Sequence, residues 1–248
     1  HLDIEKLWNQ YEQVTKETHA LYASSMESFE FEESTVRSFS RLVAACTMSK
    51  TEDHRSKPSD DLVRAMMNLM TETRDEETLE IVVITLCVLN ACFRDVPDTH
   101  QNLVLRACTD LDHYERKACA RGLVRALNTA NEEISKLALS FVCVLMNEKR
   151  TSHSFFYISD TNVVIDILIR EIRDLPSQSL LRVDHLNTLE KILLQSSWFD
   201  TGRYARADIV HALEAVIHEY DNDHTFSKEA HDAVCIFKNT HFFVFFFI

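Results

Sequence analysis

The chain of 248 residues holds only two glycines, Gly122 and Gly202, and three prolines. Ordinary usage would supply about seventeen glycines, at roughly 7% of a chain. Tight hairpins and phosphate-binding loops depend on glycine because their backbones need positive φ. The scarcity therefore predicts an all-α chain. It also excludes the Rossmann fingerprint and the Walker loop, which need several glycines at fixed spacing.

The sequence also lacks a framework for disulfides or zinc. Its seven cysteines are an odd number, they form no CxxC pair, and most of them lie inside apolar helical runs. A free cysteine in such a run behaves as a small hydrophobe. The pattern predicts reduced thiols in a cytosolic protein.

Positive charge is in deficit, with 26 Lys and Arg residues against 39 Asp and Glu residues and a net charge of −13. Nucleic acids and anionic membranes both reward a basic surface, so neither is predicted as a partner. No signal peptide or membrane-spanning run is visible, and no membrane insertion is expected. The chain begins with His1 rather than Met, which we interpret as the start of a fragment.

Helical segments joined by short connections make up the rest of the pattern. Two of them, 79–93 and 162–175, are apolar on nearly every side and are predicted to be inner helices. Irregular helical hairpins of this kind predict an armadillo- or HEAT-like solenoid, as one domain over 1–240. The tail 241–248 is apolar and has no assigned role. The other predicted helices cover residues 1–24, 36–49, 62–70, 96–108, 113–127, 132–146, 180–195, 206–220 and 227–238.

The segment 151–175, TSHSFFYISDTNVVIDILIREIRDL, is the most informative stretch. Phe155 and Phe156 are expected to pack in the core under the start of the helix. The helix is expected to end before Pro176, because the residue before a proline leaves the α region. Asp166 and Arg170 are spaced to pair at i, i+4. Ser159, Asp160 and Thr161 are candidate caps, and the polar stripe of the helix is Asn162, Asp166, Arg170 and Arg173.

Metal or catalytic chemistry finds little support in the pattern. His211, Glu214 and His218 could share a helix face with Asp208 and hold a divalent metal. The alternative is the solvated face of an amphipathic helix, and we favour it because no HExxH motif is present. No nucleophile elbow occurs, and thiols in apolar stripes are inert. We therefore predict no metal, no cofactor, no catalytic residue and no enzyme activity.

Two basic clusters are candidate contact surfaces. Arg203-Tyr204-Ala205-Arg206 follows Trp198 and Phe199, and arginine and aromatic residues are favoured at protein interfaces. The alternative, weighed equally, is a loop whose aromatics cover the edge of the fold while its arginines stay in water. For the second cluster a solvated helix face is favoured over an interface; its members are Arg116, Lys117, Arg121 and Arg125.

The run SHSFFYISDTNVVIDILIREIRDL, followed by LRVDHLNTLEKILLQ and GRYARADIVHALEAVI, resembles a known family over about residues 152–217. It is the leucine-rich, armadillo-like domain of the Nck-interacting Src-homology-3 protein, also called WISH or DIP, with fungal counterparts. The chain departs from the family pattern in having Ile158-Ser159 for a Thr-Asn pair and Ala205 for a basic residue. The matching positions of its signature are Phe155, Phe156, Tyr157, Asp160, Ile169, Arg170, Glu171, Asp174 and Leu175.

The resemblance implies a non-enzymatic, monomeric binding module of the cytoplasm, at cortical actin patches and in endocytosis. Such domains bind the actin-related protein 2/3 complex and activate it without a pre-existing filament, which nucleates linear actin filaments. The alternative is a helical-repeat adaptor for another cytosolic protein. The predicted partner-binding residues are Tyr157, Asp160, Arg170, Arg173, Arg203, Tyr204 and Arg206.

Overall fold

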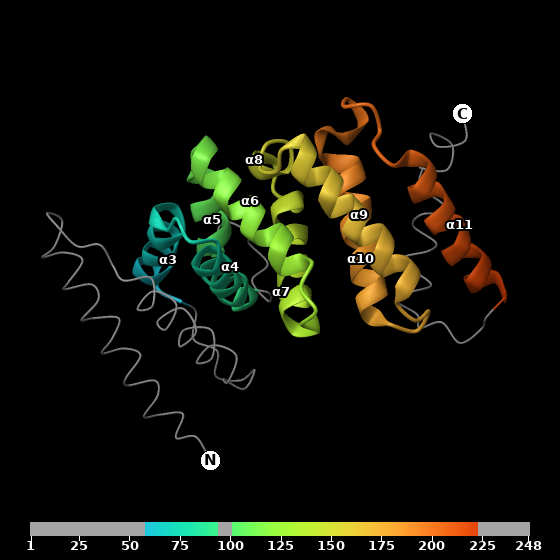
Figure 1. Cartoon of the computed structure of the whole chain (residues 1–248), viewed down its shortest axis with the longest axis horizontal. Coiled ribbons are helices and arrows are strands. Elements are labelled where there is room, and N and C mark those ends of the chain that lie inside the picture. Colours follow the sequence, from blue (N-terminus) through green and yellow to red (C-terminus); the bar gives the residue numbers. More distant parts are fainter. Residues whose placement is uncertain (1–57, 94–100, 223–248) are drawn as a thin grey trace, which may run out of the picture. The chain divides into compact units, whose positions relative to one another are not determined.

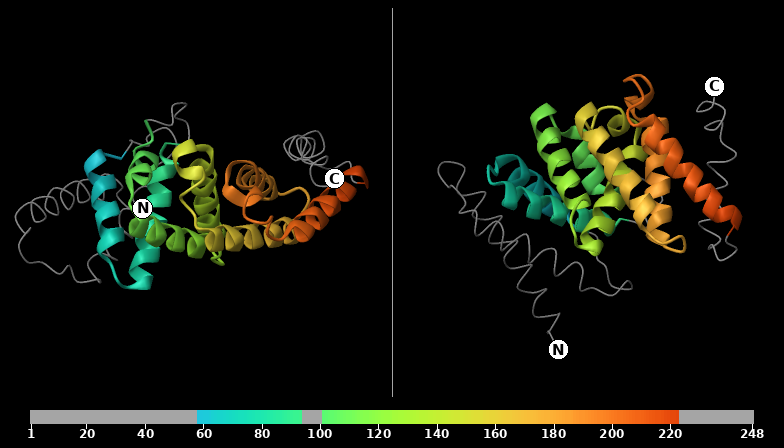
Figure 2. Two further views of the ribbon diagram at one scale, coloured as in Figure 1. Left: turned by 90° about the horizontal axis from the view of Figure 1, so that it is seen from above. Right: turned by 45° about the vertical axis from the view of Figure 1, so that its right-hand side comes forward.

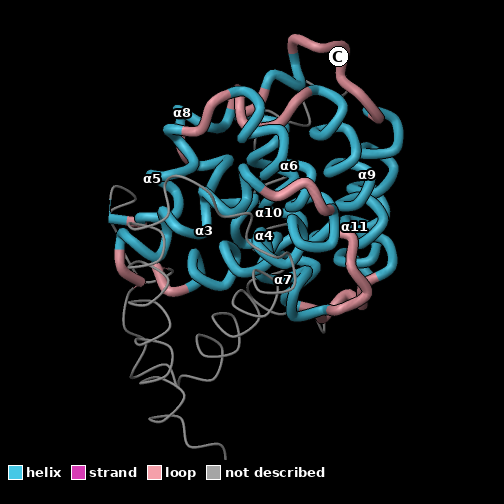
Figure 3. The backbone as a smooth tube through the Cα atoms, turned by 60° about the vertical axis from the view of Figure 1, so that its left-hand side comes forward, coloured by secondary structure: helices cyan, strands magenta, loops and turns pink. Residues whose placement is uncertain are grey.

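The computed structural model describes residues 58–93 and 101–222. All regular secondary structure in these two ranges is helical (Figure 3). The predicted all-α fold class is therefore confirmed for the described part, where helices stack on one another as in a helical solenoid. The predicted helices over 1–24, 36–49 and 227–238 and the tail 241–248 lie outside the described residues.

The chain divides into two compact units, residues 1–126 and 127–248, and each has its own packing. The expectation of one domain over 1–240 stays a prediction. In neither described range is a helix long and apolar enough to cross a lipid bilayer.

Unit 1 contains helices α3 (Asp60–Glu72), α4 (Glu76–Ala91), α5 (Leu103–Asp110) and α6 (His113–Leu127). Helix α3 packs on α4 and α5, and α4 also packs on α5. Side chains cap three of these helices, since Ser59, Asp75 and Asn102 accept hydrogen bonds from backbone N–H groups of the first turn. The predicted helix over 96–108 is not one continuous helix, because Asn102 caps a helix that begins at Leu103; residues 96–100 of the prediction lie outside the described residues.

Helix α6 approaches α4 closely at Gly122. A Cβ atom placed on Gly122 would lie 2.5 Å from Cγ2 of Val83, so only glycine fits there without a shift. Near the start of α4, Glu76 forms ion pairs with Arg121 at 3.1 Å and with Arg125 at 2.9 Å. Glycine is therefore used in this unit for close helix packing rather than for a turn.

Unit 2 contains α7 (Glu132–Asn147), the short α8 (Lys149–Ser152), α9 (Ile158–Asp174), α10 (Leu180–Gln195), the 3-10 helix η3 (Ser197–Phe199) and α11 (Arg206–Asn222). Helix α10 packs against both α7 and α9, and α11 packs against α9 (Figure 1). Figure 2 shows from other directions that α9, in yellow to orange, lies beside α11, in orange-red. The short helices α8 and η3 were not predicted.

Helix α9 begins four residues earlier than predicted. Its N-cap is Tyr157, in an extended conformation and without a side-chain hydrogen bond. The expected caps Ser159, Asp160 and Thr161 instead lie in the first turn, where the Asp160 carboxylate is favoured by the helix dipole. The predicted end is confirmed, since Leu175, just before Pro176, is already extended.

The expectation that α9 is an inner helix needs correction. Its buried side is apolar, with Val164, Ile165, Ile167, Leu168, Ile169 and Ile172. A continuous strip on the opposite side is exposed, however, and runs through Ser159, Val163, Asp166, Arg170 and Arg173. Below its start Phe155 is fully buried, as predicted, while Phe156 is only half-buried and packs edge-on against it.

Candidate functional site

A tight loop joins η3 to α11 and carries the predicted basic and aromatic cluster. We call Asp200–Arg206 the 200–206 loop. Its backbone takes positive φ at three positions, 94° at Gly202, 56° at Arg203 and 52° at Ala205. Glycine adopts such angles freely, whereas Arg203 and Ala205 carry a Cβ that makes them costly.

The indole of Trp198 anchors this loop from its buried side. Trp198 is buried, and its Nε1–H donates to the carbonyl oxygen of Tyr204 at 2.9 Å. The backbone N–H of Arg203 donates to the carbonyl of Trp198 at 3.3 Å, and that of Arg206 donates to the carbonyl of Arg203 at 3.2 Å. These contacts hold the strained backbone in one shape.

The hydroxyl of Tyr204 connects the loop to helix α9. It donates to Oδ2 of Asp166 at 2.9 Å, across 38 residues of sequence. This hydrogen bond and the negative charge of Asp166 raise the pKa of Tyr204 above its usual range. Tyr204 stays at the surface, where the residue is 40% exposed.

A second connection joins α9 to the start of α11. A terminal guanidinium nitrogen of Arg173 donates to the carbonyl of Asp208 at 3.2 Å and lies 3.5 Å from Nδ1 of His211. The Asp208 carboxylate is 3.9 Å away. His211, a candidate metal ligand, thus contacts an arginine, and no three His, Cys, Asp or Glu side chains in the described ranges are arranged to hold a metal ion.

The predicted i, i+4 pair gives way to other contacts. Asp166 accepts from Tyr204, while Arg170 forms an ion pair with the adjacent Glu171 at 2.7 Å. These contacts assemble an exposed surface from α9, the 200–206 loop and α11. We call it the α9–α11 face and define it by Val163, Asp166, Arg170, Arg173, Tyr204 and His211, all of which are exposed.

The seven predicted contact residues therefore fall into two places. Arg170, Arg173 and Tyr204 lie on the α9–α11 face, and Arg203 and Arg206 flank Tyr204 half-buried in the loop. Tyr157 and Asp160 lie half-buried at the other end of α9, about 20 Å from Arg173 along a helix axis. Their role in binding stays a prediction.

Sequence reasoning missed two buried polar residues of α10 that organise this unit. Arg182 is 3% exposed; its Nε donates to the carbonyl of Ile172 at 2.7 Å and its Nη1 to Glu219 at 2.6 Å. His185 is fully buried, and its Nδ1 lies 2.7 Å from the carbonyl of Leu181, while Nε2 has no hydrogen-bond partner among the described residues. Their position inside the apolar run LLRVDHL was the available signal.

The second basic cluster has structural contacts in unit 1. Arg121 and Arg125 both pair with Glu76, and Nε of Arg116 donates to the carbonyl of Asp112 at 3.2 Å. Of the described cysteines of this unit, Cys87, Cys108 and Cys119 are buried and Cys92 is half-buried. Burial raises the pKa of Cys87, and a hydrogen bond with Cys119 together with burial raises that of Cys108.

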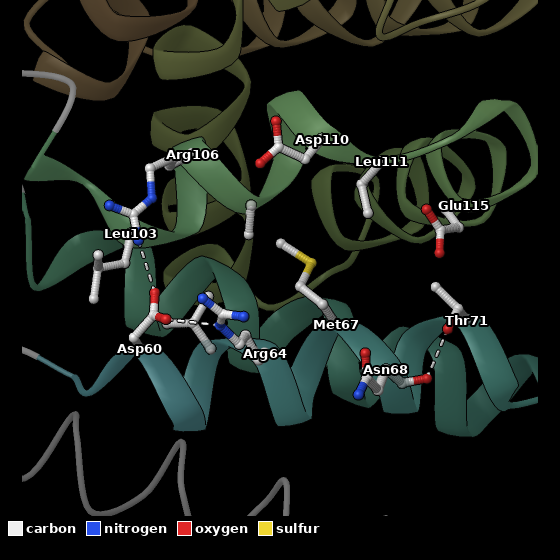
Figure 4. Close-up of a pocket in the computed structure, with 12 residues that line it drawn as sticks. Asp60, Arg64, Met67, Asn68, Thr71, Leu103, Arg106, Asp110, Leu111 and Glu115 are labelled. Carbon is white, nitrogen blue, oxygen red and sulfur yellow. Dashed lines mark hydrogen bonds and ion pairs between the residues drawn. The ribbon is translucent and has the colours of Figure 1, made fainter.

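A surface hollow of about 250 Å³ lies in unit 1 among residues of α3, α5 and the start of α6 (Figure 4). At one side Asp60 bridges Arg64 at 2.7 Å and Arg106 at 2.9 Å. At another, a carboxylate oxygen of Glu115 accepts from the backbone N–H of Asp112. Thr71 also lines the hollow, and its hydroxyl donates to the carbonyl of Asn68 at 2.8 Å.

Comparison with known proteins places these features in a known context. The model of the family described as SPIN90/Ldb17, leucine-rich domain, matches residues 75–209, more than half of the chain. The protein named dip1 of Schizosaccharomyces pombe is 31% identical over 99 residues, which cover 40% of this chain and 26% of that relative. The match thus spans about a quarter of the relative's length. The family match takes in α9 and the whole 200–206 loop.

Proposed function

The chain belongs to the SPIN90/Ldb17 leucine-rich domain family, and from this premise we propose that it binds the actin-related protein 2/3 complex and activates it without a pre-existing filament. The product would be a linear actin filament. The family match over residues 75–209 is the observation that carries this proposal. In this proposal the protein acts as a binding module in the cytoplasm, at cortical actin patches, and not as an enzyme.

The physical basis of the activation is a shift between two states of the partner. A protein that binds the active arrangement more tightly than the inactive one moves the equilibrium by that difference in affinity. About 5.5 kcal/mol of difference moves a 1:99 equilibrium to 99:1. A well-packed stack of helices suits this task because it does not adapt to both states equally.

The α9–α11 face and the 200–206 loop are the proposed contact surface. Tyrosine and arginine dominate the binding energy of many protein interfaces, and both gather here in Arg170, Arg173, Arg203, Tyr204 and Arg206. Several of these arginines already have partners within the chain. A guanidinium has five N–H donors in a planar fork, however, so one arginine can serve an internal and an external acceptor.

Actin assembly in bulk solution tests the activity. Pyrene-labelled actin is polymerised with the purified complex, without WASP-type activators and without filament seeds, and the chain is added at micromolar concentration. The expected result is a shorter lag, with unbranched filaments under a fluorescence microscope. An unchanged lag would overturn the proposal.

Charge reversal tests the surface. The double variant Arg203→Glu and Arg206→Glu should weaken binding to the complex and lengthen the lag, while helical circular dichroism stays unchanged. The matched control is Lys149→Glu with Arg150→Glu, since these cations are also in unit 2 but lie exposed on α8. Equal losses in both double variants would indicate a general charge effect rather than a contact at the loop.

A second candidate function is a scaffold for another cytosolic protein. The observation that favours it is that the match spans only 26% of the relative named dip1, so an activity of the whole relative need not reside in this part. Capture of a cytosolic protein other than actin-related subunits, together with an unchanged lag, would support the scaffold function.

A further inference from the structure

The 200–206 loop combines backbone strain with strong internal support. Two residues that carry side chains, Arg203 and Ala205, sit at positive φ on either side of Tyr204. Such conformations persist only where the surrounding structure enforces them, and they gather at functional sites. If the loop only had to join η3 to α11, glycine at these positions would lower the conformational free energy of the positive φ angles.

Support comes from both sides of Tyr204. On the buried side, Trp198 donates its indole N–H to the Tyr204 carbonyl. At the surface, the Tyr204 hydroxyl donates to Asp166 of α9. After it, the carbonyl of Ala205 accepts from the N–H of Ile209, which ties the loop to the first turn of α11.

The supported shape leaves contact groups accessible. Tyr204 is 40% exposed although its hydroxyl is already bonded, so the residue is accessible to a partner. Apart from Gly202 and its two chain neighbours, no described residue has an atom within 4 Å of the position that a Cβ of Gly202 would take, so the loop is open there. Arg203 and Arg206 lie on either side of Tyr204 in the sequence and are half-buried.

We propose that the 200–206 loop is a recognition element held in its binding shape before the partner arrives, with Asp166 and Trp198 as positioning residues. The inference rests on the proposed function and names its contact element. The occupant is a protein surface with carboxylates that meet Arg203 and Arg206 and an apolar patch that covers the Tyr204 ring. Holding the loop in advance lowers the entropy lost on binding.

Ala205→Gly separates this role from that of a simple connection. Glycine removes the cost of positive φ, so the thermal midpoint should stay equal or rise. The unbound loop then samples more shapes, and affinity for the purified actin-related protein 2/3 complex should fall about three- to tenfold. Stability and affinity thus move in opposite directions, which a purely structural loop would not produce.

The matched control is Ala207→Gly, in the first turn of α11 and exposed. It should lower the thermal midpoint, because glycine is unfavourable in a helix, and leave affinity unchanged. If the wild type binds the complex and Ala205→Gly binds it with the same affinity, the loop proposal alone is overturned. Absence of wild-type binding would overturn the loop proposal and the proposed function together.

Asp166 is tested through its hydrogen bond. Asp166→Ala and Tyr204→Phe each remove the bond and should weaken binding by similar factors, and the double variant should be no weaker than either single variant. Asp166→Asn keeps an acceptor oxygen and should restore affinity. If Asp166→Ala weakens binding and Tyr204→Phe does not, Asp166 contacts the partner directly and the positioning role is overturned.

Discussion

Helices α4 and α9 both carry a long apolar run, yet only α9 keeps a continuous exposed strip. From Thr78 to Ala91 no residue of α4 is exposed. In α9 the residues Val163, Asp166, Arg170 and Arg173 remain exposed along one side. The number of apolar residues is similar, so the difference lies in the spacing of the polar ones.

The spacing of charges therefore separates a helix that supports the fold from one that also offers a surface. After its first turn α4 carries one charged residue, the half-buried Glu80. Its other polar residues Thr85 and Asn90 are neutral and bonded internally: Thr85 donates to the carbonyl of Ile81, and Asn90 accepts from Asn102. In α9 the charged residues recur every three or four positions, which places them on one side. Substitutions can test this contrast directly.

The largest effect is expected from truncating the buried helix. Leu86 of α4 is fully buried, so Leu86→Ala should cost about 2–5 kcal/mol of unfolding free energy through lost burial and a cavity. Val163 of α9 is 45% exposed, and Val163→Ala should stay within about 0.5 kcal/mol. Urea unfolding followed by helical circular dichroism measures both, and equal midpoints would contradict the contrast.

An intermediate effect is expected where α6 meets α4. In Gly122→Ala the new methyl group would lie 2.5 Å from Cγ2 of Val83, and overpacking of this kind costs about 1–3 kcal/mol. The double variant Gly122→Ala with Val83→Ala should cost less than the sum of the single variants, because the smaller side chain makes room. Additive costs in urea unfolding would show that this contact does not govern the packing.

Much of the fold follows from local sequence, and the exceptions have identifiable causes. The helices over 113–127 and 180–195 were predicted with their observed limits. The start of α9 was misplaced because Ser159, Asp160 and Thr161 have capping side chains, whereas the observed N-cap at Tyr157 uses only its backbone. An N-cap that makes no side-chain hydrogen bond cannot be predicted from the type of residue at that position.

The candidate site was predictable in its residues but not in its connections. The sequence indicated that Tyr204 and Arg173 are candidate contacts, since both lie in recognisable segments. Their partners Asp166 and Asp208 are more than 30 residues away in the chain, and nothing in local spacing selects one carboxylate among many. The positive φ of Ala205 was equally hidden, because alanine gives no signal for that conformation.

The smallest effect on stability is expected when the pH is lowered, and it comes from the protonation of His185 of α10. Burial lowers the pKa of His185 below its usual 6.5. The hydrogen bond with the Leu181 carbonyl and the charges of Glu171 and Asp184 partly oppose this shift, and the charge of Arg170 adds to it. The unfolded chain therefore takes up a proton before the folded one does, so stability is fully present above about pH 6.5 and falls as pH drops toward the folded pKa. His185→Phe keeps a ring of similar size but cannot titrate. Between pH 7.5 and pH 5.5 the urea midpoint of the wild type should fall further than that of His185→Phe, whereas parallel losses would assign the acid response to other groups.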